Sequence, residues 1–271
     1  MSAERNIKIM GIVNLNDDSY FAESRCSGVD AALHRVSQMV AEGVDIVDIG
    51  ACSTRPGSLP VGEAEEWSRL APVLAAVRAK FPDLTISIDT YWSSVVRNAY
   101  DLIGEFIVND ISAGEDDPQM LSTVAQLGLP YVAMHKRGTP LEMQSLTDYK
   151  DVTADVVNYF KAFSEKAAAI GLQDWIIDPG FGFSKTLDQN WELLRNLSAF
   201  KELRDTNGRI PELLVGVSRK SMIYNLLGIT PEESLSATQV AHFIALRAGA
   251  DILRVHDVAA AVQTVRLYDK V

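Results

Sequence analysis

The chain has 271 residues, of which 47% are hydrophobic and 23% are charged, and its formal net charge is −11 at pH 7. This size and composition are typical of a soluble globular protein with a sizeable core. The acidic balance argues against a nucleic-acid-binding surface, which needs a basic excess. No apolar stretch approaches the roughly 18 residues that span a bilayer.

Two features bear on the compartment. The N-terminal segment from Met1 to Lys8 lacks the apolar region of a signal peptide, so export is not expected. Cys26 and Cys52 are the two cysteines of the sequence, and they form neither a disulfide framework nor a metal-ligand spacing. We therefore expect a cytoplasmic protein.

Apolar, mostly β-branched runs recur along the whole chain. Several of them are continuous rather than alternating, as expected for parallel strands that are buried on both faces. The predicted strands are residues 7–13, 44–49, 84–88, 106–108, 130–133, 174–177, 213–217 and 251–255.

The segments between these strands have the periodicity of amphipathic helices. The first has valine or leucine at helical spacing from Val29 to Val40 and ends before Gly43, a typical C-terminal cap. A later helix contains Pro72, which predicts a kink or a split. Thr230-Pro231-Glu232-Glu233 combines a capping box with a proline at the first helical position, so a helix should begin there and run to Gly249.

Eight strand–helix units in about 250 residues are typical of a (β/α)₈ barrel. We predict one domain over residues 1–271 with the fold of a TIM barrel. A doubly wound open sheet is the alternative, but its functional residues would concentrate at one switch point. Here polar signatures follow all eight predicted strands, which favours the closed barrel.

Three polar residues come directly after apolar runs. Asp89, Asn109 and Asp178 should point into the mouth of the barrel, although each could instead cap a helix. Two carboxylates and an amide suit a heterocycle that displays amine and ring N–H donors. Lys220 could donate to a carbonyl or nitrogen of the same ring, whereas Arg219 beside it should be structural and paired with an acid behind the rim.

A second group of residues suits a phosphate. Ser53-Thr54-Arg55-Pro56-Gly57 must be a loop, and it offers hydroxyl, guanidinium and backbone donors. Arg254 and His256 alternate on the last predicted strand and should face one side. Asn14 after the first strand is either a turn former or a ligand of Mg²⁺, an ion that combines one protein oxygen with waters and diphosphate oxygens.

In combination these residues resemble the dihydropteroate synthases, the folate-pathway enzymes of the pterin-binding barrel family. The resemblance extends from Met10 to Asp257. Its motifs are Ser53-Thr54-Arg55-Pro56-Gly57, Asp178-Pro179-Gly180-Phe181-Gly182-Phe183, Ser218-Arg219-Lys220-Ser221 and Arg254-Val255-His256-Asp257. It implies a transferase that joins 4-aminobenzoate to (7,8-dihydropterin-6-yl)methyl diphosphate and releases diphosphate with Mg²⁺ present. It also implies a homodimer with small-molecule substrates and no nucleic-acid or membrane partner.

The resemblance assigns the site residues to subsites. The pterin pocket contains Asp89, Asn109, Asp178 and Lys220, with Met134 and Phe183 lining it. Arg254 covers the pterin and reaches the diphosphate. The residues of the diphosphate–magnesium end are Asn14, Thr54, Arg55 and His256. Ser221 with Lys220 borders the aminobenzoate. Asp89 and Asp178 would stabilise positive charge on the pterin, while Mg²⁺, Arg254 and His256 would stabilise the leaving diphosphate. The expected catalytic residues are Asp89, Asp178, Lys220, Arg254 and His256.

The chain departs from the family in two places. Its first loop, residues 16–20, lacks the usual proline, and Cys52 replaces a glutamate before Ser-Thr-Arg. One alternative function is a methyltransferase barrel that presents a methyl-folate to a corrinoid protein, although such a barrel does not need the Ser-Thr-Arg-Pro-Gly and Ser-Arg-Lys-Ser groups. The other is a catalytically silent scaffold, which the altered loop favours. An apolar stripe at Val258, Val262 and Val265 would serve either a dimer interface or the core.

Overall fold

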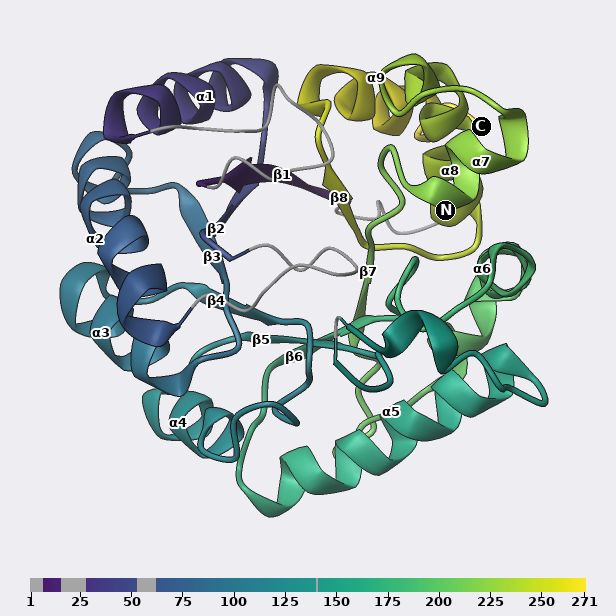
Figure 1. Cartoon of the computed structure of the whole chain (residues 1–271), viewed down its shortest axis with the longest axis horizontal. Coiled ribbons are helices and arrows are strands. Elements are labelled where there is room, and N and C mark those ends of the chain that lie inside the picture. Colours follow the sequence, from purple (N-terminus) through teal and green to yellow (C-terminus); the bar gives the residue numbers. More distant parts are fainter. Residues whose placement is uncertain (1–6, 16–27, 53–61, 140) are drawn as a thin grey trace.

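The strands of the computed structural model close into a parallel barrel in chain order, with β8 pairing back onto β1. Figure 1 shows this ring of strands enclosed by helices, which confirms the predicted (β/α)₈ TIM barrel. The structure describes residues 7–15, 28–52, 62–139 and 141–271. The strands are β1 (Lys8–Asn14), β2 (Ile46–Gly50), β3 (Thr85–Asp89), β4 (Ile107–Asp110), β5 (Tyr131–Met134), β6 (Trp175–Asp178), β7 (Glu212–Val215) and β8 (Ile252–Val255).

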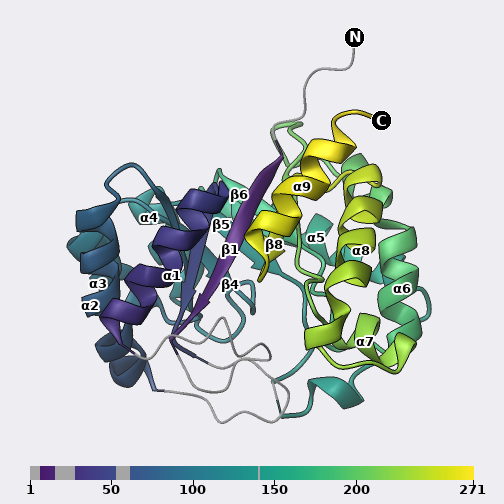
Figure 2. The same ribbon diagram turned by 90° about the horizontal axis from the view of Figure 1, so that it is seen from above.

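A helix follows each strand and packs on the outside of the barrel. Figure 2 shows the C-terminus at the end of the barrel where β1 begins. The α-helices are α1 (Val29–Glu42), α2 (Glu63–Lys80), α3 (Ser93–Ile103), α4 (Met120–Leu127), α5 (Val152–Ala169), α6 (Leu187–Arg195), α7 (Ser221–Leu227), α8 (Leu235–Arg247) and α9 (Val258–Tyr268).

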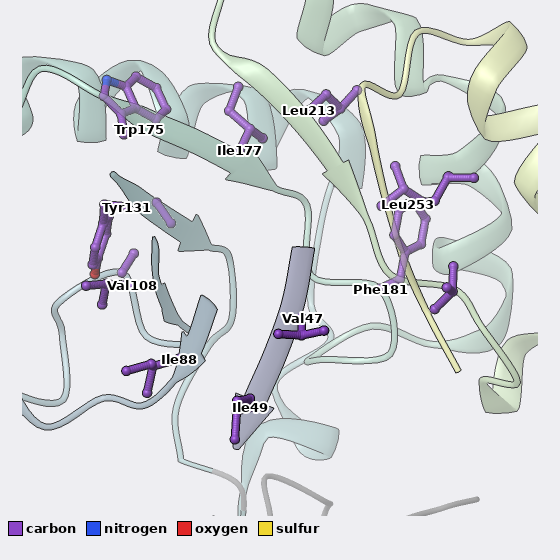
Figure 3. Packing of buried hydrophobic residues seen from close by; sticks show 14 of the residues in the cluster. Val47, Ile49, Ile88, Val108, Tyr131, Trp175, Ile177, Phe181, Leu213 and Leu253 are labelled. Atoms are coloured by element: carbon purple, nitrogen blue, oxygen red, sulfur yellow. The ribbon is translucent and has the colours of Figure 1, made fainter. Parts of the chain in front are cut away.

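Successive residues of each strand face opposite sides of the barrel wall. The outward-facing residues, among them Val47, Ile88, Val108 and Ile177, pack with the helices in one large buried cluster (Figure 3). The inward-facing residues include a second, smaller apolar cluster that fills the barrel axis. Its members are Met10, Ile46, Ile107, Val132, Ile176, Leu214 and Ile252. The polar side chains of the barrel lie next to this apolar layer, toward the carboxyl ends of the strands.

The polar residues that were predicted to follow strands belong to the strands themselves. Asn14, Asp89 and Asp178 are the last residues of β1, β3 and β6, and Asn109 is the third residue of β4. Their backbones therefore take part in the strand ladder, which fixes these side chains more firmly than a loop would.

Two helix predictions need correction. Pro72 does not split α2, because Leu70, Val73 and Leu74 are buried on both sides of it and hold the helix against the barrel. Thr230 and Glu233 do make the reciprocal capping bonds, at 2.9 and 3.4 Å. The following turn, however, is a 3₁₀-helix, η4 (Glu232–Ser234), and α8 begins only after it.

The apolar stripe of α9 faces the barrel. Val258 is fully buried, and Val262 and Val265 pack against the core cluster. The stripe therefore belongs to the core. Within the described part of the chain, no helix combines the length and the apolar character that a membrane crossing requires.

Candidate active site

The first three strands end level with one another, and β4 continues one residue further, to Asp110. In the strand register Asn14 is opposite Gly50, Gly50 is opposite Asp89, and Asp89 is opposite Asn109. Gly50 leaves room for its neighbour, because a Cβ atom there would lie 3.1 Å from the Cβ of Asp89. The carboxyl ends of β1, β3 and β4 thus bring an amide, a carboxylate and a second amide to one rim.

Arg254 of β8 reaches across the barrel to this rim. Its Nη2 lies 2.9 Å from Oδ2 of Asp89, and its Nε donates to Oδ2 of Asp48 at 2.7 Å. The guanidinium therefore joins two carboxylates that come from different strands.

Asp48 belongs to this cluster, although the sequence analysis gave it no role. Its side chain is fully buried on β2, where Oδ1 accepts a hydrogen bond from Ser87 Oγ at 2.7 Å. Oδ2 accepts from Asn109 Nδ2 at 3.1 Å as well as from Arg254. A signal was present: Asp48 interrupts the apolar run from Ile46 to Ile49, two residues before Gly50 and hence on the same face.

Asp178 faces the same cavity as Asp89. Burial raises the pKa of Asp89 to about 7; its interaction with Arg254 lowers the pKa, and the charge of Asp178 is among those that raise it. Burial also raises the pKa of Asp178, while Lys220 acts in the opposite direction. Asp178 Oδ1 accepts a hydrogen bond from the backbone N–H of Gly180 at 2.8 Å, which orients the carboxylate.

Lys220 contributes a buried cation to this cavity. Its Nζ donates to the carbonyl of Phe181 and lies 5.0 Å from the centre of the Phe183 ring. Burial lowers the pKa of Lys220 to about 8, although the charge of Asp178 raises it. The ammonium and the aromatic ring therefore form one wall of the pocket beside Asp178.

The loop after β6 is held by a second buried lysine that sequence reasoning missed. Lys185 Nζ donates to the carbonyls of Gly180 and Phe183 at 2.9 and 3.0 Å, and lies 3.1 Å from His135 Nδ1. Gly180 has a φ of +72°, and a Cβ atom there would lie 1.9 Å from the carbonyl oxygen of His135. Only glycine fits this turn. No pattern in the sequence distinguished Lys185 from a solvated lysine before a helix.

Arg219 has the structural role that was predicted. Its Nε and Nη2 donate to the two oxygens of Asp257 at 2.8 and 2.9 Å, and its Nη1 donates to the carbonyls of Pro231 and Glu232. The Nη1 bonds engage carbonyls at the start of η4, which accounts for the delayed beginning of α8. The arginine therefore ties the loop after β7 to the loop after β8.

The other predicted residues that the structure describes lie around this centre. Met134 is opposite Asp178 in the strand register, and Ser221 begins α7 next to Lys220. His256 follows β8 directly, and burial together with Arg254 lowers its pKa to about 3. This imidazole is neutral at pH 7 and can offer a hydrogen bond but no charge. Thr54, Arg55 and the altered first loop lie outside the described residues.

The donor set fits a magnesium ion that is held mainly by its substrate. Among the residues that the structure describes, no group of three or more His, Cys, Asp or Glu side chains could hold a metal. Asn14 is on the strand level of Asp89, so its amide side chain could supply one oxygen ligand. A single oxygen ligand of this kind suits Mg²⁺, which keeps several waters and takes phosphate oxygens.

Comparisons with known proteins agree with this geometry. Residues 10–256 match the family model described as "Pterin binding enzyme". The chain belongs to this family. It is 40% identical over 264 residues to the dihydropteroate synthase of Synechocystis sp., covering 96% of this chain and 89% of the relative.

Solved structures of the pterin-binding enzymes superpose closely on the barrel. The dihydropteroate synthase of Yersinia pestis in a sulfonamide drug complex has a TM-score of 0.91 and 34% identity, with 98% of this chain and 94% of that chain covered. The enzyme of Burkholderia cenocepacia complexed with 7,8-dihydropteroate has a TM-score of 0.87 and 34% identity, with 98% and 92% covered. The family resemblance predicted from the motifs is therefore confirmed.

Proposed function

We propose that this protein is a dihydropteroate synthase of folate biosynthesis that uses the barrel mouth described above for the reaction. It condenses (7,8-dihydropterin-6-yl)methyl diphosphate with 4-aminobenzoate and releases 7,8-dihydropteroate and diphosphate. The single observation that carries this assignment is the contact between Arg254 and Asp89, which brings an anion-binding cation and a ring-binding acid to one centre. The match over residues 10–256 and the dihydropteroate complex of the Burkholderia relative support it.

The pterin ring binds among the acceptors of β3, β4 and β6. Asp89, Asn109 and Asp178 accept hydrogen bonds from its amine and ring N–H groups, and Lys220 donates to a ring carbonyl or nitrogen. As the carbon–oxygen bond to diphosphate breaks, positive charge spreads over the ring, and the two carboxylates stabilise it. Met134 and Phe183 contact the faces of the ring.

The departing diphosphate is stabilised from the side of β8. Arg254 supplies a permanent positive charge, and His256, being neutral, supplies a hydrogen bond. The amine nitrogen of 4-aminobenzoate, beside Ser221, forms the new carbon–nitrogen bond and then loses a proton to water or to the diphosphate. A neutral arylamine needs no strong base, so no general base is assigned.

A magnesium ion would complete the diphosphate end. Asn14 is the described residue that would hold the ion, and Thr54 and Arg55 are proposed to contact the same diphosphate. When bound, Mg²⁺ neutralises charge that develops on the leaving oxygen.

We also propose a homodimer that functions in the cytoplasm. The dimer surface is supported by exposed apolar side chains on neighbouring helices: Val240 and Ile244 of α8 and Leu267 of α9 are 62%, 40% and 66% exposed. Helices α8 and α9 lie side by side (Figure 2) and are joined by Phe243 and Tyr268, whose ring centres are 6.1 Å apart.

The test is a reaction of the purified protein with Mg²⁺, the pterin diphosphate and 4-aminobenzoate. We expect diphosphate and a condensed product of the mass of dihydropteroate in equal amounts, and neither when aminobenzoate is omitted. Pterin binding without condensation would contradict the assignment and favour a silent scaffold. Methyl transfer from a methyl-folate to a corrinoid protein would favour the methyltransferase.

A further inference from the structure

The carboxylate of Asp48 is bonded to protein donors through both of its oxygens. It is fully buried, and three donors surround it: the Ser87 hydroxyl, the Asn109 amide nitrogen and Nε of Arg254. The two donors that line the cavity share Oδ2, while Ser87 is bonded to Oδ1. Asp48 can therefore act on a substrate only through the residues that it orients.

Asp48 determines which way the side-chain amide of Asn109 is oriented. An amide side chain offers a donor on one side and an acceptor on the other. A carboxylate paired with arginine only accepts, so the atom of Asn109 that lies 3.1 Å from it must be the nitrogen. The carbonyl oxygen Oδ1 of Asn109 is then the atom left to accept from a ligand.

The pterin ring has a group that needs this acceptor. Its exocyclic 2-amino group carries two N–H donors, and a carboxylate that binds the amino group together with ring N3–H uses only one of them. The second N–H requires another acceptor in a buried pocket, because an unpaired donor there is costly. Asn109 is 4% exposed and offers this acceptor only in the orientation that Asp48 imposes.

We propose that Asp48 is a positioning residue that fixes the Asn109 amide and thereby makes the pocket prefer a 2-amino ring over a 2-oxo ring. This inference rests on the proposed function, since the ligand is the pterin. A 2-oxo ring would place a carbonyl oxygen against Asn109 Oδ1, and two acceptors repel. Without Asp48 the amide can turn and donate to that oxygen.

The experiment compares the dissociation constants of 6-hydroxymethylpterin and its 2-oxo counterpart, 6-hydroxymethyllumazine, by titration calorimetry. Neither probe carries diphosphate, so the comparison does not involve the leaving-group end. The wild type should prefer the pterin by about 100-fold or more, as expected for a site that is built to bond a donor. In Asp48→Ala that preference should fall at least about tenfold.

Two matched variants separate the amide orientation from charge and from packing. Ser87→Ala removes the donor to the other oxygen of Asp48 and should leave the preference unchanged. Asp48→Asn removes the charge but keeps an oxygen toward Arg254 and Asn109, because Arg254 Nε must be bonded, so it should also keep the preference. An unchanged preference in Asp48→Ala, or an equal loss in Ser87→Ala or Asp48→Asn, would overturn the proposal.

The orientation itself is measured in the ligand-free wild type by neutron diffraction after deuterium exchange. We expect a deuterium between Asn109 and Asp48, and its absence would overturn the proposal even if Asp48→Ala does not fold. Failure of the proposed function has a different signature, because the wild type would then release no diphosphate with 4-aminobenzoate, whatever its preference between the two rings.

Discussion

Arg254 and Asp89 are 165 residues apart in the sequence, and their side chains meet at 2.9 Å across the mouth of the barrel. Without a ligand, the acid proposed to bind the ring is therefore engaged by the cation proposed to bind the leaving group. We expect ring N–H donors to replace the guanidinium at Asp89, and the guanidinium then to turn to the diphosphate while Asp48 retains its Nε. Substrate binding would thus reorganise a pair that is already present.

Replacement of Arg254 by methionine should affect both stability and turnover. Asp48 and Asp89 would lose their shared cation, which costs about 3–5 kcal/mol when a buried charge is left uncompensated. Turnover should fall about 100-fold or more because the leaving group loses a fixed charge. Arg254→Lys keeps the charge but cannot make both contacts, so its stability and turnover should lie between those of the wild type and of Arg254→Met. Chemical denaturation and steady-state rates measure these effects, and a Met variant that is less stable but turns over normally would contradict the proposed role.

Replacement of Asp89 by asparagine tests the acid that binds the ring. The amide oxygen can still accept from Arg254, so the fold should remain intact. We expect kcat/KM to fall about 100-fold or more, because a neutral amide cannot stabilise the charge on the ring. Circular dichroism controls for folding, and wild-type rates in a folded variant would remove Asp89 from its role.

Asp89 should also affect the pH dependence of stability. Burial raises its pKa from 3.8 to about 7, so between these pH values the folded chain holds a proton that the unfolded chain has released. The contribution of Asp89 to the free energy of unfolding therefore falls as the pH rises through this window. Asp89→Asn should lack this slope. Denaturant titrations between pH 4 and pH 7, run for both proteins, measure it, and identical slopes would contradict the burial of an ionisable group.

Lys220 should set an alkaline limit on activity. Its pKa is lowered from 10.5 to about 8, so the ammonium loses its charge above about pH 8 and kcat/KM should fall there. Between about pH 8 and pH 10.5 the unfolded chain binds more protons at this lysine, so its contribution makes the fold more stable as the pH rises. Lys220→Arg keeps its charge and should remove the alkaline limb of kcat/KM. If the limb persists unchanged, another group is responsible; a limb from Lys185 would lie at lower pH, since its pKa is about 7.

Metal removal tests the role of Asn14. Chelation should abolish condensation, and added Mg²⁺ should restore it. Asn14→Ala should raise the Mg²⁺ concentration required for half-maximal activity about tenfold or more, in line with the loss of an oriented ligand. Calorimetric titration of Mg²⁺ in the presence of diphosphate should show the same weakening without any reaction. Unchanged Mg²⁺ affinity in this variant would remove Asn14 from the metal site.

The exposed apolar face of α8 tests the dimer. Val240→Asp combined with Ile244→Asp should convert a dimer to a monomer, because two buried charges would then meet their counterparts across the two-fold axis. Sedimentation equilibrium measures the mass of the particle. The matched control is Leu146→Asp, which alters an exposed apolar residue far along the chain from α8. A monomeric wild type would contradict the homodimer.

The sequence predicted the fold because periodicity and strand ends are local signals. The eight apolar runs identified the barrel, and the polar residues at their ends made Asp89, Asn109 and Asp178 the candidate site residues. Asp48 and Lys185 were missed because their roles depend on partners from distant elements, Arg254 and His135. The stripe of Val258 and its neighbours was ambiguous for the same reason: a helix with one apolar face does not reveal what covers that face.

Local rules also failed where tertiary contacts override them. Pro72 lies inside an unbroken helix because the residues on both sides of it are buried. The turn after Thr230 is a 3₁₀-helix, where two carbonyls at its start bond to Arg219. Local sequence preferences therefore predicted these helices incorrectly, because burial around Pro72 and the hydrogen bonds from Arg219 involve residues that are distant in the sequence.

The most direct test is a crystal structure with a pterin and diphosphate bound. We predict that the ring edge contacts Asp89, Asn109 and Asp178, with Lys220 on the opposite edge, and that Arg254 leaves Asp89 for the diphosphate. A ring bound outside the barrel mouth, or an Arg254 that stays on Asp89 with both ligands present, would contradict the proposed site.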